Sequence, residues 1–125
     1  MGGGLDGVVV VQVAAGYSHS MALTAAGDLY TWGHGQYGRL GHGDVEHRSV
    51  PQVVGGTGAV MGIAGGDYHS LVTTREGRVL GFGYNGHGRL GLGAEAEDEV
   101  RTPAAIGDIR VIDNGDDGEG KEGKE

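Results

Sequence analysis

The feature that most constrains this chain is an internal repeat with a period of 50 residues. Residues 14–43 align without a gap on residues 64–93, and 12 of these 30 positions are identical. Beyond residue 93 two extra residues enter the second copy, after which Pro51 aligns with Pro103. A fixed period near 50 residues is typical of propellers and solenoids, in which each repeat forms one supersecondary unit.

Glycine divides each repeat into short strands. The chain has 29 glycines in 125 residues, and its longest glycine-free segment, 94–106, contains Pro103, so long helices are excluded. Only residues 94–100 could form a helical turn. Apolar and β-branched residues predict strands over 8–15, 19–24, 28–33, 49–54, 69–74, 78–83 and 102–107. Short strands without helices predict an all-β fold, a partial β-propeller of about two blades.

One stretch of the first copy has the spacing of a nucleotide-binding turn. Residues Gly33–Gly38 read G-x-G-x-x-G and follow a predicted strand. The second copy replaces the middle glycine, Gly35, with Asn85, and a side chain there obstructs the approach of a phosphate. Further glycines also prevent the helix whose N-terminus would hold that phosphate. We therefore predict no cofactor, and interpret Gly35 and Asn85 as turn positions with positive φ.

The histidines raise the question of a metal site. His42 and His47 lie five residues apart with two acidic residues between them, but no H-E-x-x-H motif occurs. The second copy has Leu92 at the position of His42, so the pair is not a property of the repeat. We predict that both histidines are loop residues and that the chain has no metal ligands.

A histidine followed by a serine does recur, at His19 and His69. Catalysis by such a pair would require the same set of groups in every repeat. A histidine at a fixed repeat position more commonly hydrogen-bonds a neighbouring loop or strand. We predict a structural role for both histidines, no catalytic residues and no enzymatic activity.

Composition restricts the classes of partner. The formal net charge of −8 argues against direct nucleic-acid binding, which requires a basic face. No apolar run of 18 residues occurs, so no membrane span is predicted. The absence of cysteine fits a reducing compartment, and we expect an intracellular protein, cytoplasmic or nuclear. Residues 1–7 are predicted to be a flexible N-terminus, and residues 113–125 a disordered, acidic, glycine-rich tail.

The repeated pattern resembles the repeats of the regulator of chromosome condensation family. The resemblance rests on a glycine and histidine before one strand, an aromatic residue and glycine at the end of the next, and a following G-R-L-G segment. It covers residues 8–112 and implies part of a seven-bladed propeller, with one full repeat over 27–76 and partial repeats over 8–26 and 77–112. The chain departs from the family pattern at Arg39 and Arg89, where glutamine is usual, and at Phe82, where tryptophan is usual.

The resemblance also identifies the structural repeat positions. They are Gly16, His19, Gly27, Trp32, Gly33, Gly38, Leu40 and Gly41 in the first copy. In the second copy they are Gly66, His69, Gly77, Phe82, Gly83, Asn85, Gly88, Leu90 and Gly91.

The function that the resemblance implies is a non-catalytic module for protein–protein interaction, in a fragment of a longer repeat protein. The alternatives are guanine-nucleotide exchange on a small GTPase, which founding members of the family perform, and a chromatin-associated role, which the acidic charge disfavours. Self-assembly that completes the propeller is a further alternative, because two blades leave edges and faces uncovered. The candidate partner contacts are Arg39, Arg89, Tyr37 and His87, although pairing of the arginines with acids of a neighbouring repeat is favoured.

Overall fold

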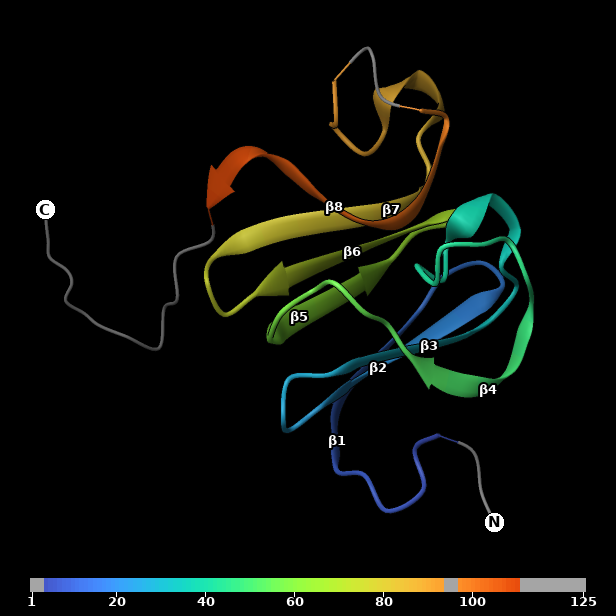
Figure 1. The fold of residues 1–125 in the computed structure, drawn as a ribbon, viewed down its shortest axis with the longest axis vertical. Coiled ribbons are helices and arrows are strands. Elements are labelled where there is room, and N and C mark those ends of the chain that lie inside the picture. Colours follow the sequence, from blue (N-terminus) through green and yellow to red (C-terminus); the bar gives the residue numbers. More distant parts are fainter. Residues whose placement is uncertain (1–3, 94–96, 111–125) are drawn as a thin grey trace, which may run out of the picture.

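The chain folds into two antiparallel sheets, seen in a computed structural model that describes residues 4–93 and 97–110 (Figure 1). The first sheet contains, in spatial order, β1 (Val10–Ala15), β2 (His19–Thr24), β3 (Leu29–Gly33) and β4 (Arg48–Val53). The second contains β5 (Val60–Gly65), β6 (His69–Thr74), β7 (Arg78–Tyr84) and β8 (Glu99–Arg110). Short 3-10 segments, η1 (Gln36–Gly38) and η2 (Gly86–Gly88), follow β3 and β7. Each four-stranded meander is a propeller blade, and the all-β prediction is confirmed.

The two blades share one register, offset by the 50-residue period. His19 lies opposite Gly33 in the first blade, and His69 lies opposite Gly83 in the second. Each blade also has an irregularity in the same strand pair, β1–β2 and β5–β6. The sequence period is therefore a structural period, and a position in the first blade has its counterpart 50 residues further on.

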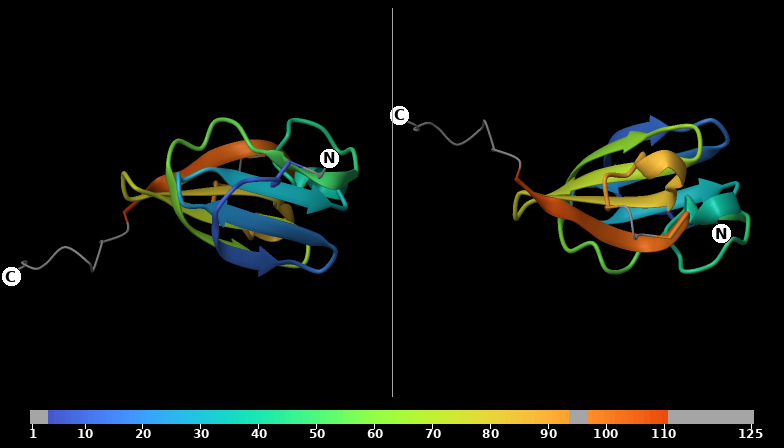
Figure 2. Two further views of the ribbon diagram at one scale, coloured as in Figure 1. Left: turned by 90° about the horizontal axis from the view of Figure 1, so that it is seen from below. Right: turned by 90° about the horizontal axis from the view of Figure 1, so that it is seen from above.

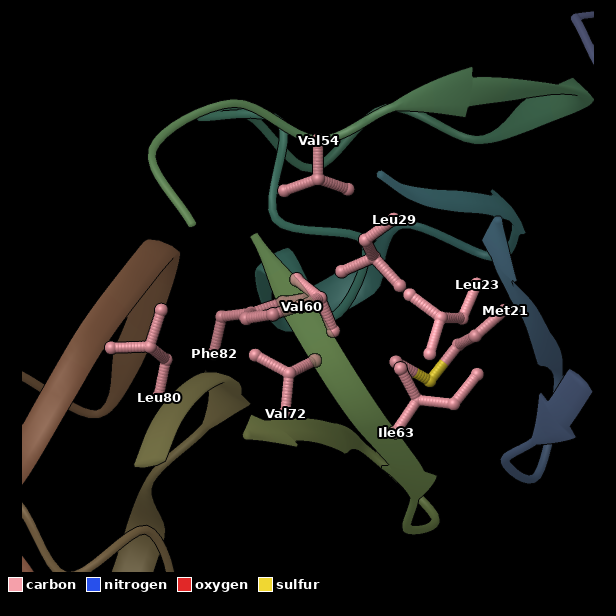
Figure 3. Packing of buried hydrophobic residues seen from close by; sticks show 9 residues of the cluster. All are labelled: Met21, Leu23, Leu29, Val54, Val60, Ile63, Val72, Leu80 and Phe82. Atoms are coloured by element: carbon pink, nitrogen blue, oxygen red, sulfur yellow. The ribbon is translucent and has the colours of Figure 1, made fainter. Parts of the chain in front are cut away.

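The hydrophobic core lies between the two blades (Figure 3). The first blade contributes Met21, Leu23, Leu29 and Val54, and the second contributes Val60, Ile63, Val72, Leu80 and Phe82. Removal of this apolar surface from water is the main driving force that stacks one blade on the next. The two views in Figure 2 show the result, with the strands of the two sheets side by side as neighbouring layers.

A glycine after η1 allows the two blades to approach each other closely. Gly41 has a φ of +79°, and a Cβ built on it would stand 2.8 Å from Cε2 of Phe82 in the second blade. A side chain at this position would strain the backbone and collide with a buried ring. Packing between the blades thus explains why the last residue of the first G-R-L-G segment, Gly41, must be glycine.

Two details differ from the sequence-based expectation. Strand β5 was not predicted, because Gly62 interrupts its apolar pattern. The helical turn that the sequence allows over 94–100 does not form in its described part, where Glu99 and Val100 begin β8. Residues 94–96 lie outside the described residues.

The expected full repeat does not coincide with one blade. Residues 27–76 supply β3 and β4 of the first blade and β5 and β6 of the second, so one sequence repeat joins two blades. At the N-terminus, residues 4–7 form turns. Residues 1–3 and the predicted tail 113–125 lie outside the described residues. No helix in the described part of the chain is long and apolar enough to cross a membrane.

Candidate partner-binding surface

Four tyrosines gather at one end of the two blades and form what we call the tyrosine surface: Tyr17, Tyr37, Tyr68 and Tyr84. They come from the β1–β2 turn, η1, the β5–β6 turn and the end of β7. The ring centroid of Tyr37 lies 4.8 Å from that of Tyr84 and 5.5 Å from that of Tyr68. The centroids of Tyr17 and Tyr68 lie 6.3 Å apart. Such aromatic pairs contribute about 0.5–1.5 kcal/mol beyond the burial of their area.

Part of the tyrosine surface is open to solvent. Tyr17 is 75% exposed and Tyr68 is also exposed. Exposed rings with hydroxyl groups are enriched at protein interfaces. Only Tyr37 was predicted as a contact. The other three were not recognised, because none of the four tyrosines has a tyrosine at the equivalent position of the other repeat.

Tyr37 has an unusual backbone conformation. Its φ of +67° is the only positive value for a non-glycine residue among those described. This left-handed conformation costs a bulky residue on the order of 1 kcal/mol. The ring is held by Tyr68 and Tyr84, and the guanidinium carbon of Arg39 lies 5.9 Å from its centroid. These contacts fix the ring in the middle of the tyrosine surface and offset the strain.

Arg39 is buried, which corrects its prediction as a partner contact. The residue is only 1% exposed. One terminal nitrogen of the guanidinium donates to Ser18 Oγ at 2.7 Å and to the backbone carbonyl of Asp67 at 3.3 Å. Nε donates to the carbonyl of Gln36 at 2.9 Å, and the guanidinium carbon lies 5.0 Å from the Tyr68 centroid. Arg39 thus joins turns of both blades through hydroxyl and carbonyl acceptors, in place of the acidic side chains that we expected.

Arg89, the counterpart of Arg39, is exposed. Its Nε donates to the carbonyl of Gly86 at 3.1 Å, and its guanidinium carbon lies 4.6 Å from the Tyr84 ring centroid. It therefore places a positive charge at the rim of the tyrosine surface. The side chain of His87 lies outside the described part of the structure.

His19 of the first blade contacts Ser70 of the second. Nε2 of His19 lies 2.8 Å from Oγ of Ser70, whose hydroxyl donates to the carbonyl of Arg39 at 2.7 Å. Since the serine hydrogen is used in this way, Nε2 carries the imidazole proton and donates it to Ser70. Ser70 is 0% exposed, so a substrate has no access to its hydroxyl. The pair connects blades and has no accessible nucleophile.

The surroundings of His19 favour its neutral form. Burial, followed by the nearby charges of Arg39 and His69, lowers the pKa of His19 to about 4. Nδ1 of His19 is buried and has no hydrogen-bond partner among the described residues. A protonated imidazole would place a second N–H there without an acceptor, so the contact between the blades requires neutral histidine.

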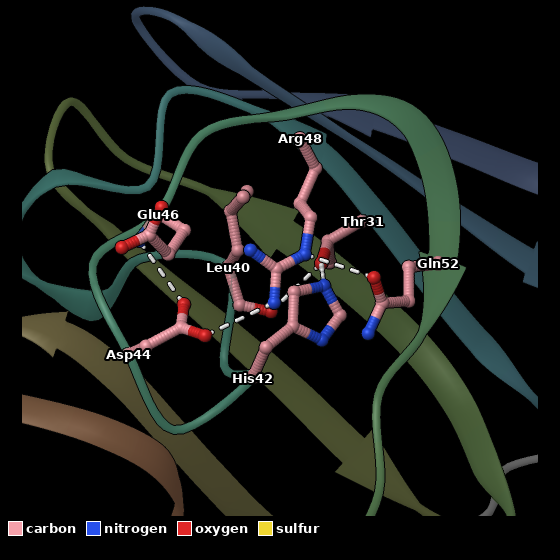
Figure 4. Close-up of polar contacts among 7 residues, drawn as sticks. All are labelled: Thr31, Leu40, His42, Asp44, Glu46, Arg48 and Gln52. Carbon is pink, nitrogen blue, oxygen red and sulfur yellow. Dashed lines mark hydrogen bonds and ion pairs between the residues drawn. The ribbon is translucent and has the colours of Figure 1, made fainter.

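The two histidines of the loop after η1, His42 and His47, make local contacts, and Figure 4 shows those of His42. Nε2 of His42 lies 2.9 Å from Oγ1 of Thr31, and Arg48 pairs with Asp44 at 3.1 Å. Nδ1 of His47 accepts a backbone N–H from the segment after β3 at 3.0 Å. Burial is the main reason that the pKa of His42 is lowered. Within the described ranges, no group of three or more histidine and acidic side chains could hold a metal ion.

The predicted positive φ at Gly35 and Asn85 is wrong, because the values are −99° and −116°. Glycine is required at position 35 because the carbonyl of Glu46 occupies the place of a Cβ. Asn85 instead holds its loop with its side chain: Oδ1 accepts the N–H of Leu90 at 3.1 Å, and Nδ2 donates to a carbonyl before β8 at 3.1 Å.

The remaining repeat positions lie in turns and in the core. Two glycines lie against the imidazole rings of the repeat histidines, namely Gly16 and Gly66. Trp32 is partly buried, and the fully buried side chains are Leu40, Phe82 and Leu90. The repeat positions with positive φ are Gly27, Gly33, Gly38, Gly41, Gly77, Gly83, Gly88 and Gly91.

Two stacked four-stranded meanders with a shared register are blades of a β-propeller. Sequence comparison gives the family: the chain belongs to the regulator of chromosome condensation (RCC1) repeat proteins. One family model of this repeat matches residues 26–73, and a second matches residues 10–39 and 62–89. Together the matches extend over residues 10–89.

Three similar proteins, one matched by sequence and two by structure, are each longer than this chain. A segment of 50 residues, 40% of the chain, is 62% identical to the human E3 ubiquitin-protein ligase HERC2 but covers 1% of it. The structure of human WBSCR16 matches 78% of the chain with a TM-score of 0.71 and 31% identity. The structure of Prp20p from Saccharomyces cerevisiae matches 81% with a TM-score of 0.70 and 26% identity. The chain spans about a quarter of each of these two solved chains.

Proposed function

We propose that this chain is a non-catalytic segment of a propeller that binds a protein partner through the tyrosine surface. The observation that carries the proposal is the gathering of four tyrosines and Arg89 at one end of the two blades. Propeller turns present side chains to a partner while the strands supply a rigid frame. Tyrosine and arginine are among the residues that contribute most to binding energy at interfaces.

The positions of the reactive side chains support a non-catalytic role. Ser70 is buried and its hydroxyl donates to a carbonyl of the neighbouring blade. His19 holds its proton toward that serine. HERC2 is named a ubiquitin ligase, but the match covers 1% of its length, so the ligase activity does not follow for this chain.

The related Prp20p supplies two concrete partners to test, since its structure is described together with its binding to Gsp1p and histones. Guanine-nucleotide exchange on a small GTPase is the second candidate function, and membership of the family favours it. Exchange requires tighter binding of the nucleotide-free GTPase than of the loaded form. Faster release of labelled GDP on addition of the chain would identify exchange, whereas binding without release supports the interaction role. Either function fits the expected cytoplasmic or nuclear location.

The experiment compares binding of the immobilised chain to purified Gsp1p and to core histones. Tyr17→Ala removes the most exposed ring of the tyrosine surface, and Val50→Ala truncates an exposed side chain of β4 outside it. We expect binding about tenfold weaker for Tyr17→Ala and unchanged for Val50→Ala. Equal binding by the wild-type chain and by Tyr17→Ala would contradict the proposed surface, and the absence of binding would exclude these partners.

A further inference from the structure

Two rings of the tyrosine surface lie close enough to be joined by a covalent bond. The ring centroids of Tyr37 and Tyr84 lie 4.8 Å apart, and the ring planes are inclined by 40°. The other tyrosine pairs in the described part of the chain are 5.5 to 6.4 Å apart and are inclined by 63° to 85°. At such steep angles the edge of one ring points at the face of the other. Among these pairs, Tyr37 and Tyr84 are therefore the best placed to join their ring carbons.

Each ring is held in place by a feature of its own loop. Tyr37 has a positive φ, and its ring is fixed in the middle of the tyrosine surface. Tyr84 lies over Gly86, where a Cβ would overlap the phenol oxygen and stand 2.8 Å from Cε1. The φ of Gly86 is not among the positive values, so glycine is needed here for the space that it leaves to the phenol. The two rings thus meet in fixed positions, one from η1 of the first blade and one from the end of β7 in the second.

The surroundings of the pair favour oxidation of tyrosine. The chain has no cysteine, whose thiolate is readily oxidised and would compete for an oxidant. Both rings are only partly buried, so water can accept the phenolic protons. Tyr68 is exposed and its ring centroid lies 5.5 Å from that of Tyr37. A radical formed at the surface of the molecule therefore reaches the pair through rings in contact.

We propose that Tyr37 and Tyr84 form a dityrosine cross-link when the chain meets a one-electron oxidant, such as hydrogen peroxide activated by a haem peroxidase. Each phenol gives up one electron and its hydroxyl proton and becomes a tyrosyl radical. The two radicals pair in a new carbon–carbon bond between the ring positions next to the hydroxyl groups. The hydrogen on each joined carbon then moves to the oxygen, which restores both phenols. One peroxide takes up the two electrons and two protons and leaves as two molecules of water.

The cross-link joins the two blades covalently. It closes the chain between η1 of the first blade and the end of β7 in the second, and so removes conformational freedom from the unfolded chain. We therefore expect the oxidised chain to melt at a higher temperature than the untreated chain. The proposal concerns a contact between the two blades, and it does not depend on whether the tyrosine surface binds a partner.

Treatment of the full chain, in dilute solution, with a haem peroxidase and limiting hydrogen peroxide tests the site. We expect dityrosine fluorescence from a product that remains monomeric on a denaturing gel and has lost the mass of two hydrogen atoms. Cleavage after arginine places Tyr84 in 79–89 and Tyr68 in 49–75, and it places Tyr37 in the peptide that ends at Arg39. Mass spectrometry should therefore find 79–89 joined to the peptide of Tyr37.

Three tyrosine variants make the test specific. Tyr37→Phe and Tyr84→Phe keep a ring at each position but remove the phenolic hydrogen, and each should lower the fluorescence to background. Tyr30→Phe, on β3 outside the tyrosine surface, should leave the yield unchanged. Cross-links that mainly join separate chains, a yield unaffected by Tyr84→Phe, or a melting temperature that oxidation does not raise would overturn the proposal.

Discussion

The two blades carry the same repeat but differ where one covers the other. Arg39 of the first blade is 1% exposed because the β5–β6 turn of the second lies over it, whereas its counterpart Arg89 is exposed. The reverse holds at the aromatic position, where Phe82 is buried against the first blade and Trp32 is only partly buried. Whether a repeat position is buried therefore depends on the neighbouring blade and not on its residue type alone.

The second strands of the two blades show the same difference. In β2 every residue except Ser20 is buried, whereas burial alternates along β6 between the face toward the first blade and the open face. Alternating burial is what an antiparallel sheet shows when one face lacks a neighbour. Stability in this chain should thus depend on contacts between blades, and paired substitutions at equivalent positions measure that dependence.

The largest difference is expected between Phe82→Ala and Trp32→Ala. Truncation of the fully buried ring of Phe82 should lower the free energy of unfolding by about 3–5 kcal/mol. Truncation of the partly exposed Trp32 should cost about 1–2 kcal/mol, since less apolar area returns to water. Urea unfolding of the two variants and of the wild-type chain gives both values. Equal losses would contradict a core that lies between the blades.

Acid should weaken the blade contact through His19. Its pKa is about 4 in the folded chain and 6.5 ordinarily, so between these pH values the unfolded chain binds a proton that the folded chain excludes. The stabilisation is complete above pH 6.5 and is lost as the pH falls toward 4, by on the order of 3 kcal/mol. The free energy of unfolding, measured with urea across this pH range, should depend less steeply on pH in His19→Asn than in the wild-type chain. His69→Asn should alter this dependence by a smaller amount, because the side chain of His69 is less buried. A profile unchanged by His19→Asn would contradict this account.

The arginine pair should differ by a smaller amount. Arg39→Ala removes three hydrogen bonds of a buried guanidinium, and we expect a loss of about 2–3 kcal/mol. Arg89→Ala removes an exposed guanidinium with one carbonyl contact, for which about 1 kcal/mol or less is expected. Thermal and urea unfolding of the two variants check the order. A larger loss for Arg89→Ala would reverse the comparison.

The serine pair should give the smallest difference. Ser70→Ala leaves the ring N–H of His19 and the carbonyl of Arg39 without partners, at an expected cost of about 1–2 kcal/mol. Ser20→Ala, on the outward side of the first blade, should change the free energy of unfolding by about 0.5 kcal/mol or less. Indistinguishable values would mean that the hydrogen bond between the blades does not stabilise the fold.

The sequence predicted those features that repeat. The 50-residue period located both blades, and strands such as 19–24 and 69–74 were predicted at their observed bounds. The turn glycines Gly27 and Gly77 were also visible, since each separates two apolar segments. Local pattern suffices for such elements because each depends on residues close to it in the chain.

The features that sequence reasoning missed depend on residues far apart in the chain. Three of the four tyrosines of the surface were not predicted, because each occurs in one repeat only and they meet through the stacking of blades. Arg39 was only a candidate partner contact in the sequence, and its acceptor on Asp67 could not be identified there because Asp67 belongs to the neighbouring blade. The need for glycine at position 35 was assigned to positive φ, whereas it arises from the carbonyl of Glu46 in the following loop. None of these contacts leaves a signal in the local sequence.

Burial between the blades keeps His19 neutral, and its Nε2–H donates to Ser70 of the second blade. NMR of the full chain with ¹⁵N-labelled histidine, titrated between pH 7 and pH 4, measures this directly. We predict that His19 has its proton on Nε2 at pH 7 and titrates at a pKa of about 4. A His19 that titrates near 6.5, or that carries its proton on Nδ1 at pH 7, would contradict the account of how the blades are joined.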